Sequence, residues 1–262
     1  MKLCKKVKVV DVRPFGQPMT AGPEFFELRL ENPGWDEWKP GQFVMLRPTS
    51  FGLEHVWARP FSIAMCDKQE LTLFIQRVGR GTAHIAALEP GDHVLVWGPL
   101  GTSFVQEPDT HTLLLAGGVG IAPFKGYAIL HPKRDNLRLV FAHRASARCY
   151  PYEQLADAVK AERVQEEKPE HLARVITLLH ERISQYADGL VLACGPAPFL
   201  TTVRKYALEY GARCQLSLEN RMACGVGACL GCVTPGVDGE NRRVCVEGPV
   251  FWAQDIALGG GK

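Results

Sequence analysis

The chain has 262 residues, of which 46% are hydrophobic, and it carries 30 Lys and Arg against 28 Asp and Glu, a formal net charge of +2. This length allows two domains or three small ones, each with an ordinary hydrophobic core. The nearly balanced charge gives no basic surface for nucleic acid, so no nucleic-acid partner is expected. The longest nearly apolar run, residues 112–124, contains three glycines and a proline and is too short to cross a bilayer, so no membrane-spanning role is expected.

The nine cysteines indicate whether the protein belongs to an oxidising or a reducing compartment. Four lie close together near the C-terminal end, and the other five stand apart from one another: Cys4, Cys66, Cys149, Cys194 and Cys214. An odd number with this scatter argues against a disulfide framework and for a reducing compartment. The positive charge at the N-terminus is not followed by an apolar segment, so no secretory signal is expected and a cytoplasmic protein is predicted.

The first part of the chain, residues 1–107, is predicted to be an antiparallel β-barrel domain. Short β-rich runs are separated by turn-forming pairs such as Pro33-Gly34 and Pro40-Gly41. The expected strands are 6–12, 25–30, 42–46, 71–76 and 93–96. Several short strands at this spacing are typical of a small closed or nearly closed barrel. One helix, residues 82–88, is expected to interrupt it.

Residues 108–212 have a different order of predicted elements, in which strands alternate with helices. The expected strands are 112–116, 137–142 and 190–193, and the expected helices end at residue 130 or cover 153–163 and 199–210. The charged segment 161–171 is expected to be a surface excursion. Alternation of this kind predicts a parallel α/β sheet of the nucleotide-binding type. The expected fold is therefore α+β and multidomain, with a small metal module after residue 212.

The last part, residues 213–262, carries the most specific motif. Its pattern is C-x4-C-x2-C-x12-C, formed by Cys224, Cys229, Cys232 and Cys245. Buried thiolates need a cation or a covalent bond, so a shared metal is expected. The spacing is that of plant-type [2Fe–2S] proteins, whereas structural zinc usually takes two short C-x2-4-C hooks. A [2Fe–2S] cluster is favoured, with zinc and disulfides as alternatives.

Two motifs in the first domain fit a flat ring joined to a pyrophosphate. In Arg59-Pro60-Phe61-Ser62 the guanidinium suits a phosphate, the aromatic side chain a flat ring and the hydroxyl a ring heteroatom. Taken alone, this tetrapeptide is equally an ordinary strand with one surface arginine. Gly79-Arg80-Gly81-Thr82 precedes the expected helix, where glycines allow a pyrophosphate to approach the backbone.

Two further motifs follow strands of the expected sheet. Gly117-Gly118-Val119-Gly120 comes directly after the strand 112–116, and Cys194-Gly195-Pro196 ends the strand 190–193. The first is not a G-x-G-x-x-G fingerprint. Both nevertheless place small residues at the carboxyl ends of parallel strands, where the ligand crevice of an open α/β sheet lies.

In their order along the chain, these motifs resemble those of ferredoxin–NADP reductase-type flavoproteins: R-P-F-S on a flavin barrel, G-G-V-G-I-A-P at a nucleotide turn and C-G-P at a strand end. The chain is more closely similar to the electron-transfer subunits of NAD-dependent (class 1B) dihydroorotate dehydrogenases. That resemblance covers essentially the whole chain, and the stretch E-N-R-M-A-C-G-V-G-A-C is its most specific part.

The resemblance implies three sets of binding residues. FAD would be bound by Arg59, Pro60, Phe61, Ser62, Ile75, Gln76, Arg77, Gly81 and Thr82, although the family often has an aromatic residue where Gln76 stands. NAD(H) would be bound by Gly117, Gly118, Gly120, Pro123, Cys194, Gly195 and Pro196. Cys194 would lie near the nicotinamide, where a chemical role is conceivable. The [2Fe–2S] cluster would be held by Cys224, Cys229, Cys232 and Cys245.

The resemblance also implies a function. The chain would be the NAD-linked oxidoreductase subunit that passes electrons through FAD and [2Fe–2S] between NAD and an FMN-containing dihydroorotate dehydrogenase catalytic subunit, in pyrimidine (UMP) biosynthesis. The assembly would be a heterotetramer of two plus two. One alternative is the flavin and iron–sulfur subunit of a ferredoxin–NADP oxidoreductase or a cytoplasmic hydrogenase. Another is a non-catalytic NAD-sensing protein with structural zinc.

The choice between NAD(H) and NADP(H) depends on the residues after the second strand of the sheet. Arg144 and Arg148 lie there and are placed to clamp a 2′-phosphate. The resemblance to NAD-linked enzymes favours NAD(H).

Overall fold

The computed structural model describes residues 4–16 and 24–258. The remaining residues, 1–3, 17–23 and 259–262, belong to the predicted first and third domains and lie outside the described part. No helix in the described ranges is long and apolar enough to cross a membrane. The domain boundaries after residues 107 and 212 remain predictions.

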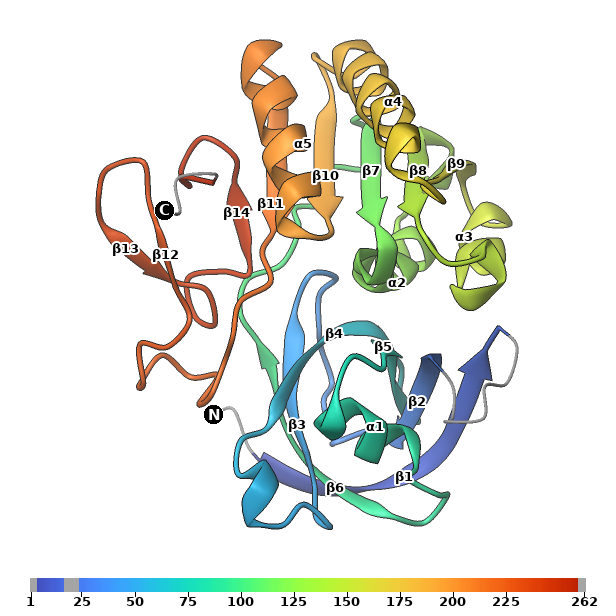
Figure 1. Ribbon diagram of the computed structural model, residues 1–262, viewed down its shortest axis with the longest axis vertical. Coiled ribbons are helices and arrows are strands. Elements are labelled where there is room, and N and C mark those ends of the chain that lie inside the picture. The colour runs from blue at the N-terminus through green and yellow to red at the C-terminus, as the bar shows by residue number, and fades with distance from the viewer. Residues whose placement is uncertain (1–3, 17–23, 259–262) are drawn as a thin grey trace.

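The first part of the chain forms a closed six-stranded barrel (Figure 1). Its strands are β1 (Cys4–Phe15), β2 (Phe25–Glu31), β3 (Phe43–Pro48), β4 (Arg59–Cys66), β5 (Glu70–Gln76) and β6 (His93–Leu100). They pair antiparallel in the order β1-β2-β5-β4-β3-β6. Closure leaves no unpaired edge, and alternating apolar residues such as Leu28, Leu46 and Ile63 fill the interior. The predicted barrel is confirmed.

Two short helices accompany the barrel. A 3₁₀ turn, η1 (Leu53–His55), lies between β3 and β4, and helix α1 (Arg80–Ala86) lies between β5 and β6. The sequence predicted α1 two residues too late. Both helices border the cavity described below.

The second part is a six-stranded sheet in the order β14-β11-β10-β7-β8-β9. Its strands are β7 (Thr112–Gly117), β8 (Leu137–His143), β9 (Lys160–Gln165), β10 (Leu190–Cys194), β11 (Arg213–Ser217) and β14 (Val250–Trp252), and only β14 runs antiparallel to its neighbour. Its helices are α2 (Ala122–Leu130), α3 (Tyr152–Ala156), α4 (Leu172–Gln185) and α5 (Ala197–Glu209).

Helices cover both faces of this sheet because its central strands are apolar on both sides. In β7, Leu113 and Leu115 share a core with α4 and α5, whereas Leu114 and Ala116 share a core with α2 and α3. Figure 1 shows α4 and α5 lying in front of the sheet. The predicted parallel α/β architecture is confirmed.

Two predictions in this region are wrong. The expected helix 153–163 ends at Ala156, and residues 160–165 form β9 rather than helix or surface excursion. The charged residues of β9 mask its strand character, because it is an edge strand that pairs only with β8. Helix α4 was missed, although Val175, Leu179 and Ile183 bury one side of it at a spacing of four residues.

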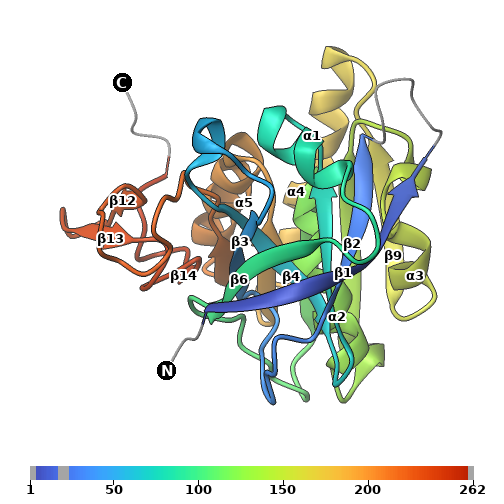
Figure 2. The ribbon, with the colours of Figure 1, turned by 90° about the horizontal axis from the view of Figure 1, so that it is seen from below.

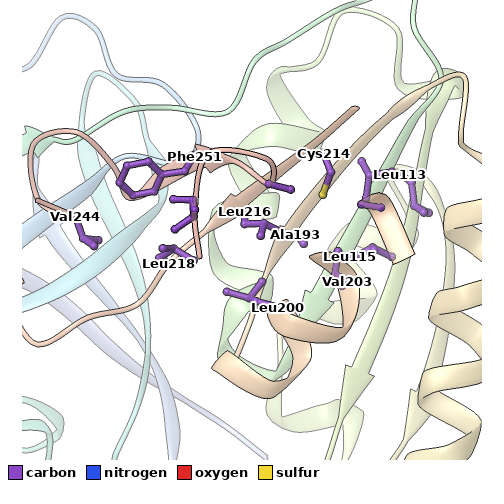
Figure 3. Close-up of a cluster of buried hydrophobic side chains, with 14 of the residues drawn as sticks. Leu113, Leu115, Ala193, Leu200, Val203, Cys214, Leu216, Leu218, Val244 and Phe251 are labelled. Atoms are coloured by element: carbon purple, nitrogen blue, oxygen red, sulfur yellow. The ribbon is translucent and has the colours of Figure 1, made fainter. Parts of the chain in front are cut away.

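The C-terminal module is mostly irregular. Its regular parts are β14 and a small hairpin of β12 (Val233–Pro235) and β13 (Asn241–Arg243). Figure 2 shows the module at one side of the molecule, next to the barrel and α5. One hydrophobic core continues from the sheet and α5 through Leu216 and Leu218 to Phe251 and Val244 of the module (Figure 3).

Candidate functional site

The Arg59 motif and the start of α1 face each other across one cavity. The cavity has a volume of about 260 Å³ and is lined by Glu54, His55, Arg59, Val78, Gly79, Arg80, Gly81 and Thr82. An added Cβ on Gly81 would lie 3.1 Å from Arg59 Nε, so glycine lets the guanidinium lie against the first turn of the helix. Arg59 is also anchored, because its Nη1 donates a hydrogen bond of 2.6 Å to the Trp57 carbonyl.

Thr82 shapes the turn that enters α1. Its Oγ1 accepts hydrogen bonds from the backbone N–H groups of Val78 (2.9 Å) and Gly79 (3.1 Å). The first N–H groups of a helix have no intrahelical acceptor, so this turn offers donors to an anion beside Arg59. The predicted association of Arg59 with Gly81 and Thr82 is present in the fold.

His55 also lines this cavity, although no sequence motif singles out this lone histidine. Its side chain is only 7% exposed, and its Nδ1 is buried without a hydrogen-bond partner in the described part of the chain. A buried polar atom without a partner costs free energy, which a bound group would recover. The cavity therefore fits a phosphate-bearing cofactor.

The predicted residues at the end of β5 have different positions. Ile75 is 1% exposed and packs in the barrel core, so only its backbone is available to a cofactor. Gln76 and Arg77 are half-buried. The Arg77 backbone N–H donates to the Glu24 carbonyl at 2.7 Å, which fixes the end of the strand.

The two sheet motifs meet at the carboxyl ends of β7 and β10. These strands are parallel neighbours, and Ala116 pairs with Cys194. An added Cβ on Gly195 would lie 3.0 Å from Gly117 Cα, and one on Gly120 would collide with the Cys194 carbonyl. Glycine is therefore needed for this close approach. Gly118, Pro123 and Pro196 complete the predicted set; Pro123 lies in the first turn of α2, and Pro196 directly precedes α5.

Cys194 lies beside two residues that the sequence reasoning did not select. Ser217 hydrogen-bonds its side chain, and Glu219 is near enough to act on it electrostatically. Burial is the main reason that the pKa of the Cys194 thiol is raised to about 12, and Glu219 adds to the rise. At neutral pH the thiol is protonated. Cys194 is therefore suited to line a nucleotide site as an uncharged side chain and not to act as a nucleophile. Ser217 ends the strand next to β10, so only the strand order reveals it.

The four cysteines of the C-terminal module form two pairs. The side chains of Cys224 and Cys229 lie within hydrogen-bonding distance, and so do those of Cys232 and Cys245. In the described ranges no three His, Cys, Asp or Glu side chains converge on a single metal position. A structural zinc ion needs four ligands around one centre. Two pairs suit a centre with two metal atoms, each taking two thiolates, as in a Cys₄ [2Fe–2S] site.

Backbone N–H groups surround these sulfurs. Val226 N–H donates to Cys224 Sγ at 3.4 Å, and Gly227 N–H donates to Cys245 Sγ at 3.1 Å. Gly225 and Gly227 have positive φ values of 70° and 81°, which turn the loop so that its N–H groups face sulfur. Hydrogen bonds of this kind stabilise thiolate ligands and tune cluster potentials.

Proton affinities in the two pairs differ. Burial opposes ionisation of Cys224, but backbone hydrogen bonds outweigh it and lower its pKa to about 6. Burial, with the Cys232 side chain beside it, raises the pKa of Cys245 to about 12. A positively charged centre would be needed to ionise the buried pair. All nine cysteines are free thiols in the fold.

Known proteins resemble the chain in the module and over most of its length. The iron–sulfur cluster binding domain of dihydroorotate dehydrogenase B matches residues 219–257. The chain is 31% identical over 229 residues to the dihydroorotate dehydrogenase B (NAD(+)) electron transfer subunit of Caldanaerobacter subterraneus subsp. tengcongensis, covering 84% of this chain and 90% of that one. It is 34% identical to the subunit of the same name from Geobacillus kaustophilus, covering 84% and 87%.

A solved structure of an NADH-dependent reduced ferredoxin–NADP oxidoreductase is similar with a TM-score of 0.77, at 22% identity, over 95% of this chain and 91% of that one. The barrel and the nucleotide-type sheet, together with the four-cysteine module, thus place the chain in the class of ferredoxin reductase-like folds. Within that class, the chain belongs to the family of dihydroorotate dehydrogenase B electron transfer subunits.

Proposed function

We propose that the chain passes electrons between NAD(H) and a separate FMN-containing dihydroorotate dehydrogenase catalytic subunit, through FAD and a [2Fe–2S] cluster, in pyrimidine (UMP) biosynthesis. The observation that carries this proposal is the contact between the cysteine loop and the barrel strand next to the Arg59 motif. Met45 pairs with Pro60 of that motif, and its side chain packs against Gly225 of the loop. Sites for a flavin and a cluster would thus be neighbours.

The cofactors supply the redox chemistry when bound: flavin exchanges a hydride with NAD(H) and single electrons with iron–sulfur centres. The chain binds and orients them. Arg59 and the first turn of α1 would hold the FAD pyrophosphate, and Phe61 and Ser62 would bind its ring. The glycine turn after β7 and Cys194–Pro196 border NAD(H), while the four cysteines hold the cluster.

A nicotinamide dinucleotide without a 2′-phosphate fits the end of β8. Arg144 lies there, but its Nη2 is already paired with Glu166 Oε1 at 3.0 Å. Glu166 follows the neighbouring strand β9 and is anchored by its backbone N–H on the His143 carbonyl at 2.8 Å. A carboxylate at this position accepts hydrogen bonds from ribose hydroxyls and repels a phosphate. This pair supports NAD(H) as the substrate.

The catalytic subunit would dock on the outer side of the cysteine module. Cys229 is exposed there, and so are the apolar side chains of Val226 (52%), Leu230 (60%) and Val246 (38%). Val246 lies against Gly227, so these side chains surround the cysteine loop. Exposed apolar residues around an electron-transfer terminus are suited to a protein partner. A heterotetramer of two plus two is the assembly proposed.

The test uses the purified chain with and without that catalytic subunit. The chain alone should bind FAD and a red-brown [2Fe–2S] cluster, be bleached by NADH, and fail to oxidise dihydroorotate. Adding the catalytic subunit should produce NAD-linked dihydroorotate oxidation. Turnover by the chain alone would refute the division of labour, and a colourless zinc protein would favour the NAD-sensing alternative. Co-purification with a ferredoxin–NADP oxidoreductase or hydrogenase subunit would favour the other assembly.

A further inference from the structure

The cysteine loop is seated on two neighbouring strands of the barrel. The indole Nε1 of Trp97 in β6 donates a hydrogen bond of 3.2 Å to the carbonyl of Cys224. In β3, Met45 is fully buried and lies so close to Gly225 that an added Cβ there would collide with its Cγ. Met45 and Trp97 are themselves partners across the two strands. The loop therefore touches the barrel at two adjacent points.

The same strands lead directly to the Arg59 motif. Met45 pairs with Trp97 on one side and with Pro60 on the other. Paired strands lie about 4.8 Å apart, so Pro60, Met45 and Trp97 form a row across three strands. Because the barrel is closed, this row connects the two sites through neighbouring strands of one sheet.

The other hydrogen bonds of the loop at this end lie within the module: the Asn220 side chain donates to the Val233 carbonyl at 3.1 Å, and Gly227 N–H donates to Cys245 Sγ at 3.1 Å. The residues around Cys224 belong to no helix or strand, and Cys224 Sγ accepts a local bond from Val226 N–H. The far end of the module is held separately, because Thr102 bonds the Gly248 and Val250 carbonyls at 2.6 and 2.8 Å. The bond from Trp97 thus anchors the end of the module that carries the first cysteine.

We propose that Trp97 is a positioning residue for the cluster. Its indole N–H holds the Cys224 carbonyl against the barrel, and this sets the Cys224 and Cys229 half of the cluster relative to the flavin motif. The inference rests on the proposed function, because it requires a cluster at the four cysteines. If Trp97 only packs in the core that it shares with Cys232 and Cys245, removing its donor will leave the cluster unchanged.

Trp97→Phe tests the inference, because it keeps an aromatic ring and removes the donor. Trp38→Phe is the matched control, since the Trp38 indole donates a bond of 2.6 Å to another cysteine carbonyl, that of Cys66, within the barrel. Iron and FAD content, the EPR spectrum of the dithionite-reduced cluster and its midpoint potential are measured for both. One electron from dithionite reduces the cluster, so the readout does not depend on turnover.

In Trp97→Phe, FAD and iron content should stay close to those of the original protein. The ratio of molecules with the cysteine loop against the barrel to molecules with the loop displaced should fall about fivefold. This is the factor expected for the loss of one neutral hydrogen bond. This should appear as a second or broadened EPR signal with a shifted potential, absent from Trp38→Phe. Identical spectra for Trp97→Phe and the original protein, or the same change in both variants, would overturn the inference. An original protein without a cluster would instead refute the proposed function.

A second pair of variants tests the inference if the Trp97→Phe protein does not fold or does not assemble a cluster. Gly225→Ala should displace the loop, because its Cβ collides with Met45 and its φ of 70° is strained for alanine, and should change the EPR spectrum. Adding Met45→Ala removes the collision and should restore the spectrum in part. If Gly225→Ala leaves the spectrum unchanged, or if Met45→Ala restores nothing, seating on the barrel does not position the cluster.

Discussion

Ala116 and Cys194 are paired across the parallel strands β7 and β10, which brings the glycine turn and the Cys-Gly-Pro motif together although they are far apart in the sequence. The close approach continues beyond the pair, where Gly120 faces the Cys194 carbonyl. The nucleotide site proposed here depends on this junction.

Gly120→Ala should disrupt the junction. Its added Cβ has no space beside the Cys194 carbonyl, so we expect a loss of stability of about 1–3 kcal/mol, as for overpacking elsewhere. Reduction of bound FAD by NADH should also slow. Chemical denaturation and stopped-flow absorbance measure the two effects. Gly211→Ala strains a glycine of positive φ in open surroundings, so it should lower stability without slowing the reduction of FAD; an unchanged rate of reduction in Gly120→Ala would contradict the prediction.

Glu166→Gln should weaken the preference for NADH. The change removes the carboxylate that repels a 2′-phosphate and frees Arg144 to bind one. We expect the ratio of flavin reduction rates with NADH and NADPH to fall by roughly tenfold, equal to about 1.4 kcal/mol. Glu153→Gln removes the partner of Arg163 in a comparable exposed ion pair and should leave the ratio unchanged. An unaltered ratio in Glu166→Gln would place the ribose elsewhere.

His55→Phe should weaken FAD binding without weakening the protein that lacks FAD. The buried Nδ1 has no hydrogen-bond partner in the described residues, and the Glu54 carboxylate is 3.9 Å away. Removing Nδ1 therefore costs the unliganded fold no hydrogen bond, whereas it removes a contact to a phosphate-bearing ligand. FAD affinity should fall about tenfold, while that for riboflavin, which has no phosphate, should be unchanged. Fluorescence titration measures both. A parallel loss for both ligands would mean that His55 only supports the fold.

Stability should fall as the pH drops from about 6.5 to 5, because of two buried histidines. Burial lowers the pKa of both His131 and His143, and nearby Arg163 lowers that of His143 further. Both bind a proton less readily in the folded than in the unfolded protein, so the unfolded chain binds more protons below its own histidine pKa and stability is lost as pH falls through this window. Urea midpoints at the two pH values measure the loss, and His143→Phe should reduce it. An unchanged slope would contradict this assignment.

Cys229→Ser should separate the reduction of FAD by NADH from the delivery of electrons to the catalytic subunit. Reduction of FAD by NADH should stay largely intact, because the flavin and nucleotide residues are untouched, whereas delivery to the catalytic subunit should stop. Anaerobic absorbance and coupled dihydroorotate oxidation measure the two. Cys4→Ser, at an exposed cysteine outside the module, is the control. If both activities disappear in Cys229→Ser, the cluster is required for the chain to fold and not only for electron transfer.

Much of the architecture was predictable because glycine and proline separate the barrel strands and because β7, β8 and β10 are apolar runs. The cysteine spacing also distinguished the cluster type before any geometry was available. β9 was not predictable, since its strand character comes from pairing with β8 and not from its charged residues. Trp97, His55 and Glu166 have no local motif, and each acquires its proposed role only when distant segments meet.

The most direct test of the account is an anaerobic titration of the purified chain with NADH, followed by visible absorbance and EPR together. The account predicts that the flavin bleaches and that the EPR signal of a reduced [2Fe–2S] cluster appears in an amount comparable to the chain. Full reduction of the flavin with no cluster signal, in a preparation that contains iron and sulfide, would contradict it.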